Sequence, residues 1–275
     1  MKLNRRQVIT TALAASVSSA WPRTARAEGA PNLQSQFEKL GLTKAEPMPI
    51  VVQGSDFNGG LLYDESYSDM PKGSYLLQPC ARIGDVEKKG RTGVLPMFHI
   101  ARLDWPDGTS IEQGIANSLA LLKDGLGLDT ENVVLVGTPV LEQYRSIFDS
   151  AGIGNRQIII RSEQEAKAAG NGSGVFRHPD DDAIEFVTAG IYLWLRDSPP
   201  ASVNAYPLSD DWLEIGEISL DPSFPLGAGF GIERLLLAQG SELPDWEIQK
   251  QQLLEMIDSD SAGEIPAGRA IFENS

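Results

Sequence analysis

Apolar residues follow strand-like and helix-like patterns in alternation along the chain. Compact runs rich in β-branched and aromatic residues, typical of strands, occupy residues 50–52, 74–83, 94–103, 133–136, 157–161, 183–195 and 212–220. Apolar residues with helical spacing occupy residues 32–40, 111–122, 140–148 and the segment after Pro244. Strands and helices are mixed without a clear linker, so we expect one large domain or two small ones.

Local signals sharpen three of these expectations. Residues 74–83 and 94–103 are joined by a polar, charged loop and predict a long-looped hairpin. Residues 110–113 (SIEQ) form a capping box that opens a helix. We expect the tail from Asp258 to be loosely ordered.

Three alternate glycines, Gly227, Gly229 and Gly231, stand directly before a helical pattern at 232–238. Glycine favours places where the chain bends or approaches a ligand closely. A helix N-terminus offers free N–H groups, and Arg234 in the first turn adds a forked cation. The segment therefore predicts a phosphate-binding site, with a purely structural turn as the alternative.

The first 27 residues have the anatomy of a twin-arginine export signal. An Arg-Arg pair at positions 5–6 precedes an apolar run at 8–21, and Ala25-Arg26-Ala27 is a small-x-small cleavage site. The apolar run is too short for a convincing membrane span. The alternative is a disordered or amphipathic N-terminus of a cytosolic protein. We expect export by this route, to the periplasm or otherwise out of the cytoplasm, and a folded domain over residues 28–275.

Charge and composition narrow the function. The net charge is −15, and the first 27 residues hold five of the 23 basic residues and none of the 38 acidic ones. The remaining chain therefore carries a net charge of −20, which repels polyphosphates at long range. A single cysteine, Cys80, excludes an intrachain disulfide, and two histidines make a zinc cluster unlikely to form.

The hairpin and the glycine segment resemble parts of class II aminoacyl-tRNA synthetases. Residues 78–93 (QPCARIGDVEKKGRTG), followed by Met97-Phe98-His99, are similar to motif 2 of alanyl-tRNA synthetase. Residues 227–236 (GAGFGIERLL) resemble motif 3, in a form close to that of pyrrolysyl-tRNA synthetase. The resemblance spans roughly residues 74–240. It implies an α+β fold in which helices flank a mainly antiparallel sheet.

The resemblance also implies roles for individual residues in adenylate formation with ATP and Mg²⁺. Arg82 would stabilise the α-phosphate, and Arg234 would hold the distal phosphates. Phe98 would stack on adenine. Glu214 and Glu217, on the strand before motif 3, would bind Mg²⁺, which needs only one or two carboxylates.

Further positions follow from the same alignment. The implied nucleotide-binding set also contains Glu87, Gly229, Gly231 and Glu233. The implied substrate-binding residues are Gly227 and His99, and both depart from the alanyl family. That family has an aspartate for the substrate ammonium at the place of Gly227, and a glutamate at the place of His99. We therefore do not expect selectivity for alanine.

Each role has a structural alternative. Arg82 is also suited to a surface salt bridge, Phe98 to the core, and Glu87 to an ordinary loop. Glu214 and Glu217 are three residues apart, so an unbroken strand would turn them to opposite faces unless a bulge intervenes.

Two functions from different classes remain. The first is ATP-dependent activation of an amino acid to an aminoacyl-adenylate by a catalytic core without tRNA-recognition domains. The alternative is an exported, non-catalytic protein that binds an amino acid or a nucleotide. A third alternative, an exported structural partner without a small ligand, would give the polar candidate residues no use. The acidic charge and the lack of a basic run argue against tRNA as a partner.

Two further expectations concern assembly. Motif 1, the dimer element of the family, is faint in this sequence, and Pro47 and Pro49 before residues 50–52 resemble a remnant of it, so a homodimer is an open alternative. We expect no membrane association once the export signal has been removed.

Overall fold

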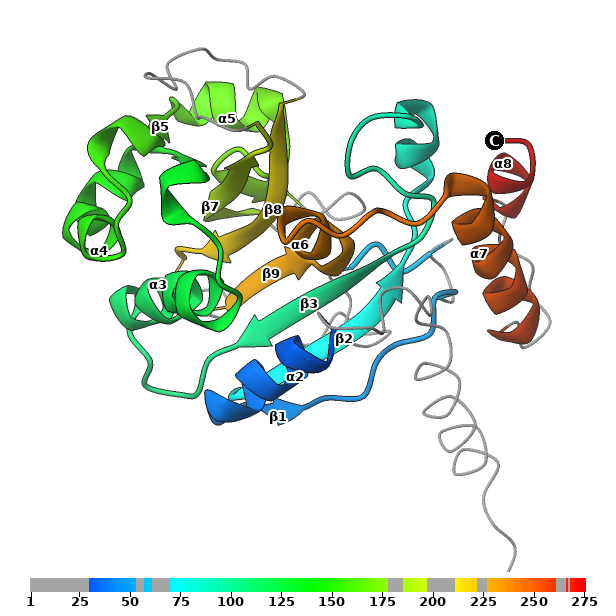
Figure 1. The fold of residues 1–275 in the computed structure, drawn as a ribbon, viewed down its shortest axis with the longest axis horizontal. Helices are drawn as coiled ribbons and strands as arrows, with labels where there is room; N and C mark the ends of the chain where they lie inside the picture. The colour runs from blue at the N-terminus through cyan, green and yellow to red at the C-terminus, as the bar shows by residue number, and fades with distance from the viewer. Residues whose placement is uncertain are drawn as a thin grey trace, which may run out of the picture.

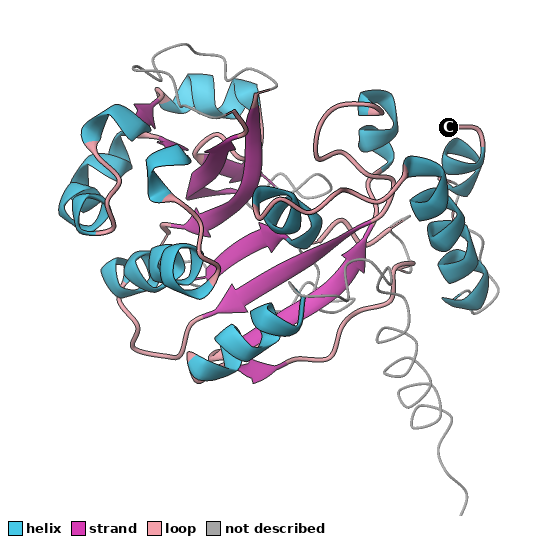
Figure 2. Cartoon of the chain, in the orientation of Figure 1, coloured by secondary structure: helices cyan, strands magenta, loops and turns pink. Residues whose placement is uncertain are grey.

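The computed structural model describes residues 30–52, 57–60, 70–177, 185–196, 211–221, 227–260, 266 and 268–275. The proposed export signal lies outside these residues. The described chain is an α+β fold in which helices flank a mixed, mostly antiparallel nine-stranded sheet (Figures 1 and 2). The predicted α+β class, with a mainly antiparallel sheet and flanking helices, is therefore confirmed.

The strands follow the order β1-β2-β3-β9-β8-β7-β4-β5, with β6 paired to β7. Their bounds are β1 Thr43–Lys44, β2 Ser74–Cys80, β3 Phe98–Asp104, β4 Val133–Gly137, β5 Ile158–Ile160, β6 Val175–Arg177, β7 Glu185–Trp194, β8 Trp212–Ser219 and β9 Gly227–Gly231. The β1–β2 and β4–β5 pairs are parallel, and the other pairs are antiparallel.

The helices lie mainly between the strands in sequence. The α-helices are α2 Ala30–Lys39, α3 Ile111–Ala120, α4 Arg145–Ser150, α5 Glu163–Ala169, α6 Ile232–Ala238, α7 Trp246–Asp260 and α8 Arg269–Glu273. Shorter turns are η1 Ile83–Lys88, η2 Leu121–Gly125, η3 Thr130–Asn132, η4 Pro139–Tyr144 and η5 Asn155–Gln157. As predicted, Ser110 caps α3, and its hydroxyl accepts a hydrogen bond from the Gln113 N–H at 3.2 Å.

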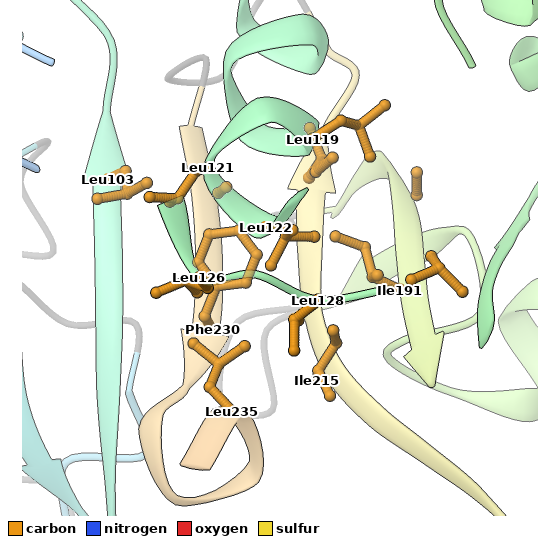
Figure 3. Close-up of a cluster of buried hydrophobic side chains, with 14 of the residues drawn as sticks. Leu103, Leu119, Leu121, Leu122, Leu126, Leu128, Ile191, Ile215, Phe230 and Leu235 are labelled. Carbon is orange, nitrogen blue, oxygen red and sulfur yellow. The ribbon is translucent and has the colours of Figure 1, made fainter. Parts of the chain in front are cut away.

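One face of the sheet is buried under α2, α3, α4 and α6. The core there takes its apolar side chains from both layers, and Figure 3 shows a central part, including Leu103, Leu119, Ile191, Phe230 and Leu235. Burial of each such side chain contributes about 1.5–3 kcal/mol, so this layer is the main source of stability. Side chains of the opposite parity on β3, β8 and β9 are only partly buried, and they form the second face.

A smaller core ties the C-terminal helices to the hairpin. Leu253 and Ile257 of α7 and Phe272 of α8 pack with Ala81 and Met97, which flank the connection between β2 and β3. The C-terminal helices therefore support the segment that follows Cys80.

Several predicted elements differ from the structure. Residues 50–52 hold an isolated bridge at Val52 in place of a strand. The polar loop after residue 83 begins with η1, and residues 140–148 divide into η4 and α4. The alternate glycines form strand β9 in place of a bend. The tail expected to be loose contains α8, because Phe272 is fully buried in the smaller core.

No helix in the described part of the chain is both long enough and apolar enough to cross a membrane.

Candidate functional site

The hairpin brings Arg82 and Phe98 together at one end of the sheet. Cys80 pairs with Phe98 in the β2–β3 register, and Arg82 follows with extended backbone before η1 begins. The Arg82 guanidinium carbon lies 4.9 Å from the centre of the Phe98 ring, which is a cation–π contact. Arg82 Nε also donates a hydrogen bond to the Gly59 carbonyl at 2.9 Å. Because Arg82 is an exposed residue, its charge is accessible to a ligand.

Arg234 reaches the sheet from the first turn of α6, directly after β9. Its Nε donates to the Gly93 carbonyl at 3.0 Å, at the far end of the hairpin connection. One terminal nitrogen donates to the Glu214 carbonyl at 3.0 Å and to the Glu214 carboxylate at 3.1 Å. Arg234 therefore joins the hairpin connection to β8.

A β-bulge in β8 places Glu214 and Glu217 on the same face. Glu217 pairs with Gly190 and Glu214 pairs with Tyr192, so the partners on β7 are only two residues apart. The register shift leaves Ile215 as the extra residue, and Ile215 and Gly216 are both buried. The bulge therefore lets both acidic side chains face one site.

The turn that contains Gly172 lies directly over the two carboxyl groups. The Gly172 N–H and the Thr188 hydroxyl each donate a hydrogen bond of 2.8 Å to one Glu217 oxygen. The Tyr192 hydroxyl donates to the Gly172 carbonyl at 3.1 Å. A side chain at Gly172 would place its Cβ only 2.6 Å from a Glu214 carboxylate oxygen. Glycine is therefore required where the turn crosses the sheet.

Burial and charge repulsion make Glu217 an unusual acid. Desolvation first, and then the Glu214 charge, raise the pKa of Glu217 to about 7, while the Thr188 and Gly172 hydrogen bonds and the charge of Arg82 oppose this rise. Tyr192 has a raised pKa for the same two reasons, burial and the neighbouring acids. The Glu214–Glu217 pair is thus a region of excess negative charge that a cation would relieve.

The two arginines flank this acidic pair. Arg234 is bonded to Glu214, and Arg82 is close enough for its charge to lower the pKa of Glu217. Residues from the hairpin, β8 and the start of α6 therefore meet on one face of the sheet, although more than 150 residues separate Arg82 from Arg234. Two cations beside two carboxylates suit a polyanion that carries a metal ion.

His99 and Glu233 lie on the other side of β3. His99 is 2% exposed and Glu233 is 5% exposed. The Glu233 carboxylate lies 2.7 Å from His99 Nδ1, and its second oxygen accepts the His99 backbone N–H at 2.8 Å. The structure thus pairs them on the buried side of β3, away from the face that carries Phe98. Substrate binding by His99 or nucleotide binding by Glu233 would require the side chain to lie on the Phe98 face. Their geometry indicates that they fix α6 against β3.

The remaining predicted residues are spread along β9 and η1. Gly227 is buried opposite Asp104, and a Cβ there would lie 2.0 Å from the Leu103 carbonyl oxygen. Gly229 and Gly231 are partly exposed on β9, and Gly231 caps α6. Glu87 is exposed near the end of η1. The structure gives Gly227 a packing role and leaves Gly229 beside the acidic pair.

Sequence reasoning missed Gly172, Thr188 and Tyr192. The glycine-rich turn at 170–174 was visible in the sequence, but nothing in it indicated that its backbone would lie on β7 and β8. A Cβ at Gly190 would come within 2.0 Å of the Gly172 carbonyl oxygen, so glycine at both positions permits this contact.

Among the described residues, no three His, Cys, Asp or Glu side chains gather as a metal site. The sequence matches no protein-family model and no curated protein sequence.

Proposed function

We propose that the protein binds ATP–Mg²⁺ on this face of the sheet and activates an amino acid, or a related carboxylic acid, as its adenylate. One observation carries the proposal: three separate parts of the chain come together on this face. They are the hairpin with Arg82 and Phe98, the start of α6 with Arg234, and β8 with Glu214 and Glu217. The adjacency of β3 and β9 also supports a class II synthetase-like core, because the motif 2-like hairpin and the motif 3-like segment pair directly.

In the proposed reaction, a carboxylate oxygen of the acid attacks the α-phosphorus of ATP. A bond forms between that oxygen and phosphorus, and the bond to the leaving pyrophosphate breaks. Arg82 would stabilise the charge that develops on the α-phosphate, since a guanidinium can donate two hydrogen bonds to phosphate oxygens. Arg234, already held by Gly93 and Glu214, would orient the distal phosphates.

Phe98 would stack on the adenine ring. Arg82 now covers one side of the Phe98 ring, so the base would use this side only after the guanidinium moves from the ring to a phosphate. Such an exchange is favourable, because a charge-assisted hydrogen bond to phosphate is stronger than an exposed cation–π contact.

Glu214 and Glu217 fit a Mg²⁺ site. Their mutual repulsion raises the pKa of Glu217, and bringing two carboxylates to one divalent ion removes that penalty. The ion would neutralise charge on ATP oxygens. The protein's own part is to hold Glu217 in place through Thr188 and Gly172.

We further propose that the protein is exported by the twin-arginine route, acts on small molecules in the periplasm and does not charge tRNA. ATP is scarce outside the cytoplasm, so the nucleotide or adenylate would be loaded before export of the folded protein. A homodimer is compatible with this scheme.

The decisive experiment is amino-acid-dependent exchange of pyrophosphate into ATP by the full chain, with all proteinogenic amino acids tested singly. Exchange with one acid, absent without it, would support the enzyme. Ligand-induced stabilisation without exchange would favour the alternative, a non-catalytic binding protein. If no amino acid supports exchange and no nucleotide stabilises the protein, the proposed nucleotide site would be refuted.

A further inference from the structure

A pair of buried amides, Asn58 and Gln78, holds the short segment that contacts Arg82. Both amide side chains are 0% exposed. The Asn58 Oδ1 oxygen accepts the Gly60 N–H at 2.9 Å and the Gln78 side-chain N–H at 3.4 Å. The bond from the Gly60 N–H back to the side chain of residue 58 closes a turn, and this turn fixes the backbone of Gly59.

The backbone of Asn58 is anchored as well as its side chain. Its N–H donates to the Ile50 carbonyl at 2.8 Å, and its carbonyl accepts the Ala81 N–H at 3.0 Å. Ala81 directly precedes Arg82 in the chain. The turn and the start of the Arg82 backbone therefore belong to one hydrogen-bonded unit.

This unit determines where the Arg82 guanidinium lies. The Gly59 carbonyl accepts its Nε–H at 2.9 Å. A Cβ at Gly60 would lie 3.6 Å from one terminal nitrogen of Arg82, so the glycine backbone runs alongside the guanidinium. In the described part of the chain, no group accepts a hydrogen bond from the two terminal nitrogens. The contact with Gly59 thus fixes the near end of the guanidinium and leaves its outer fork for a ligand.

Packing does not explain an asparagine at position 58. The Asn58 Nδ2 nitrogen is buried and has no hydrogen-bond partner among the described residues. An unsatisfied buried donor lowers stability, so an apolar side chain of similar size would suit this position better if it only had to fill space. The amide oxygen, with its two hydrogen bonds, is therefore the part of Asn58 that the structure uses.

We propose that Asn58 is a positioning residue for Arg82. Its amide oxygen holds the turn, the turn directs the Gly59 carbonyl, and that carbonyl holds Nε so that the terminal nitrogens face the α-phosphate. The last step rests on the proposed function, whereas the hold of Asn58 on Arg82 belongs to the protein without a ligand. Because Asn58 is fully buried, it acts only through Arg82.

The hold on Arg82 is measurable without any ligand. A hydrogen-bonded Nε proton exchanges with solvent more slowly than a free one, so we would follow arginine Nε exchange in the full chain by nuclear magnetic resonance. Asn58→Ala removes the acceptor of the turn and should accelerate exchange at Arg82 by about tenfold, the equivalent of one hydrogen bond. Arg234 is the internal control, because its Nε donates to the Gly93 carbonyl, and its exchange should not change.

Two further variants grade the effect. Asn58→Asp keeps an oxygen for Gly60 and Gln78, so exchange at Arg82 should stay slow. Asn58→Ser offers a weaker turn of the same kind and should give an intermediate rate, and it provides the test if the alanine variant does not fold. Unchanged exchange at Arg82 in the serine and alanine variants would overturn the proposal. Faster exchange at Arg82 and Arg234 alike would also overturn it, because the fold would then be loosened as a whole.

A double-mutant cycle on ATP–Mg²⁺ binding tests the last step. Asn58→Ala should weaken binding by up to about tenfold in the otherwise wild-type chain. It should add no loss to Arg82→Ala, because positioning has no effect once the guanidinium is absent. Binding of adenosine, which has no phosphate, should be unchanged. Equal losses of ATP binding in the two backgrounds would overturn the positioning role.

The two measurements separate this proposal from the proposed function. Faster exchange at Arg82 in Asn58→Ala, in a protein that binds no ATP, would uphold the hold of Asn58 on Arg82 and refute the nucleotide site. ATP binding that depends on Arg82 but not on Asn58 would overturn the positioning role and leave the nucleotide site intact.

Discussion

Glu214 and Glu217 both approach Gly172, although an unbroken strand would turn residues three apart to opposite faces. The Gly172 N–H donates to Glu217 at 2.8 Å, and the space beside its Cα is closed by the Glu214 carboxylate. The bulge at Ile215 is the cause, because it adds one residue to β8 without a partner on β7. Two acids are thus forced together on a surface that water only partly reaches, which has consequences for pH dependence.

The first prediction concerns stability and pH. Glu217 has a pKa of about 7 in the folded protein against the ordinary value of 4.5, so the folded state binds more protons than the unfolded state between these values. Stability is therefore greatest below about pH 4.5 as far as this group is concerned, and it falls as pH rises to about 7. At about 1.4 kcal/mol per pKa unit, the loss is at most about 3.5 kcal/mol.

The measurement is urea unfolding of the full chain at several pH values from 5 to 8. Glu217→Gln keeps the acceptor oxygen for Gly172 and Thr188 but cannot ionise, so its stability should fall less over this range than that of the wild type. Parallel curves for the two proteins would contradict the raised pKa. Addition of Mg²⁺ should reduce the wild-type loss above pH 7 if the pair binds the ion.

The bulge also marks the limit of what sequence could predict at this site. The pattern of apolar residues located β8 almost to the residue, because burial of one face dictates that pattern. The Ile215-Gly216 pair gives no local signal of a register shift, since the shift depends on pairing with β7. The candidates Arg82, Phe98, Arg234, Glu214 and Glu217 were found by their likeness to family motifs, and their meeting on one face required tertiary structure.

His99 and Glu233 illustrate a second limit. Polar residues beside a motif are attractive as ligand contacts, yet these two satisfy each other in the interior. Nothing local distinguishes a buried pair from an exposed one, because Glu233 reaches His99 across 134 positions of sequence. The tail was misjudged for a related reason: α8 is short, and it is held by packing of Phe272 and not by helical propensity.

A second prediction tests this buried pair. Glu233→Ala leaves the His99 backbone N–H and ring without their acceptor, so the free energy of unfolding should fall by about 3 kcal/mol. Glu255→Ala, at an exposed position on α7, should change it by less than about 0.5 kcal/mol. If Glu233 were a nucleotide contact alone, Glu233→Ala would weaken ATP–Mg²⁺ binding and leave the urea midpoint unchanged.

A third prediction concerns the turn over the acidic pair. Gly172→Ala places a methyl group 2.6 Å from a Glu214 oxygen and 2.9 Å from the Tyr192 hydroxyl, at a backbone φ of +83°. Gly240→Ala has a similar φ of +85° but meets nothing within 4 Å among the described residues. The left-handed backbone alone should cost each variant about 1–2 kcal/mol of stability, and Gly172→Ala should lose more because of its two close contacts.

The difference between these glycine variants then reports on the site. Gly172→Ala should in addition weaken binding of ATP–Mg²⁺, since Glu214 must move, whereas Gly240→Ala should bind as the wild type does. Equal nucleotide affinity in both variants, measured by calorimetry, would show that the turn and Glu214 have no part in binding.

The last prediction distinguishes the charge of Arg82 from its geometry. A hydrogen bond to a charged group contributes about 1.5–3 kcal/mol, so Arg82→Ala should weaken ATP–Mg²⁺ binding by roughly ten- to a hundredfold. Arg82→Lys keeps the charge but not the fork, and it should recover only part of this loss. Arg91→Ala, an exposed arginine on the same connection, is the control and should have little effect. A general attraction of ATP to positive charge would instead make the Arg91 and Arg82 variants alike, and full recovery by lysine would show that no bidentate contact exists.

Because Arg82 also rests on Phe98, loss of the Arg82 side chain frees that ring, so the alanine variant should keep adenine stacking. Binding of adenosine, which has no phosphate, should therefore be unchanged or stronger in Arg82→Ala, and a parallel loss of adenosine and ATP binding would indicate local disruption of the hairpin and not a missing phosphate contact.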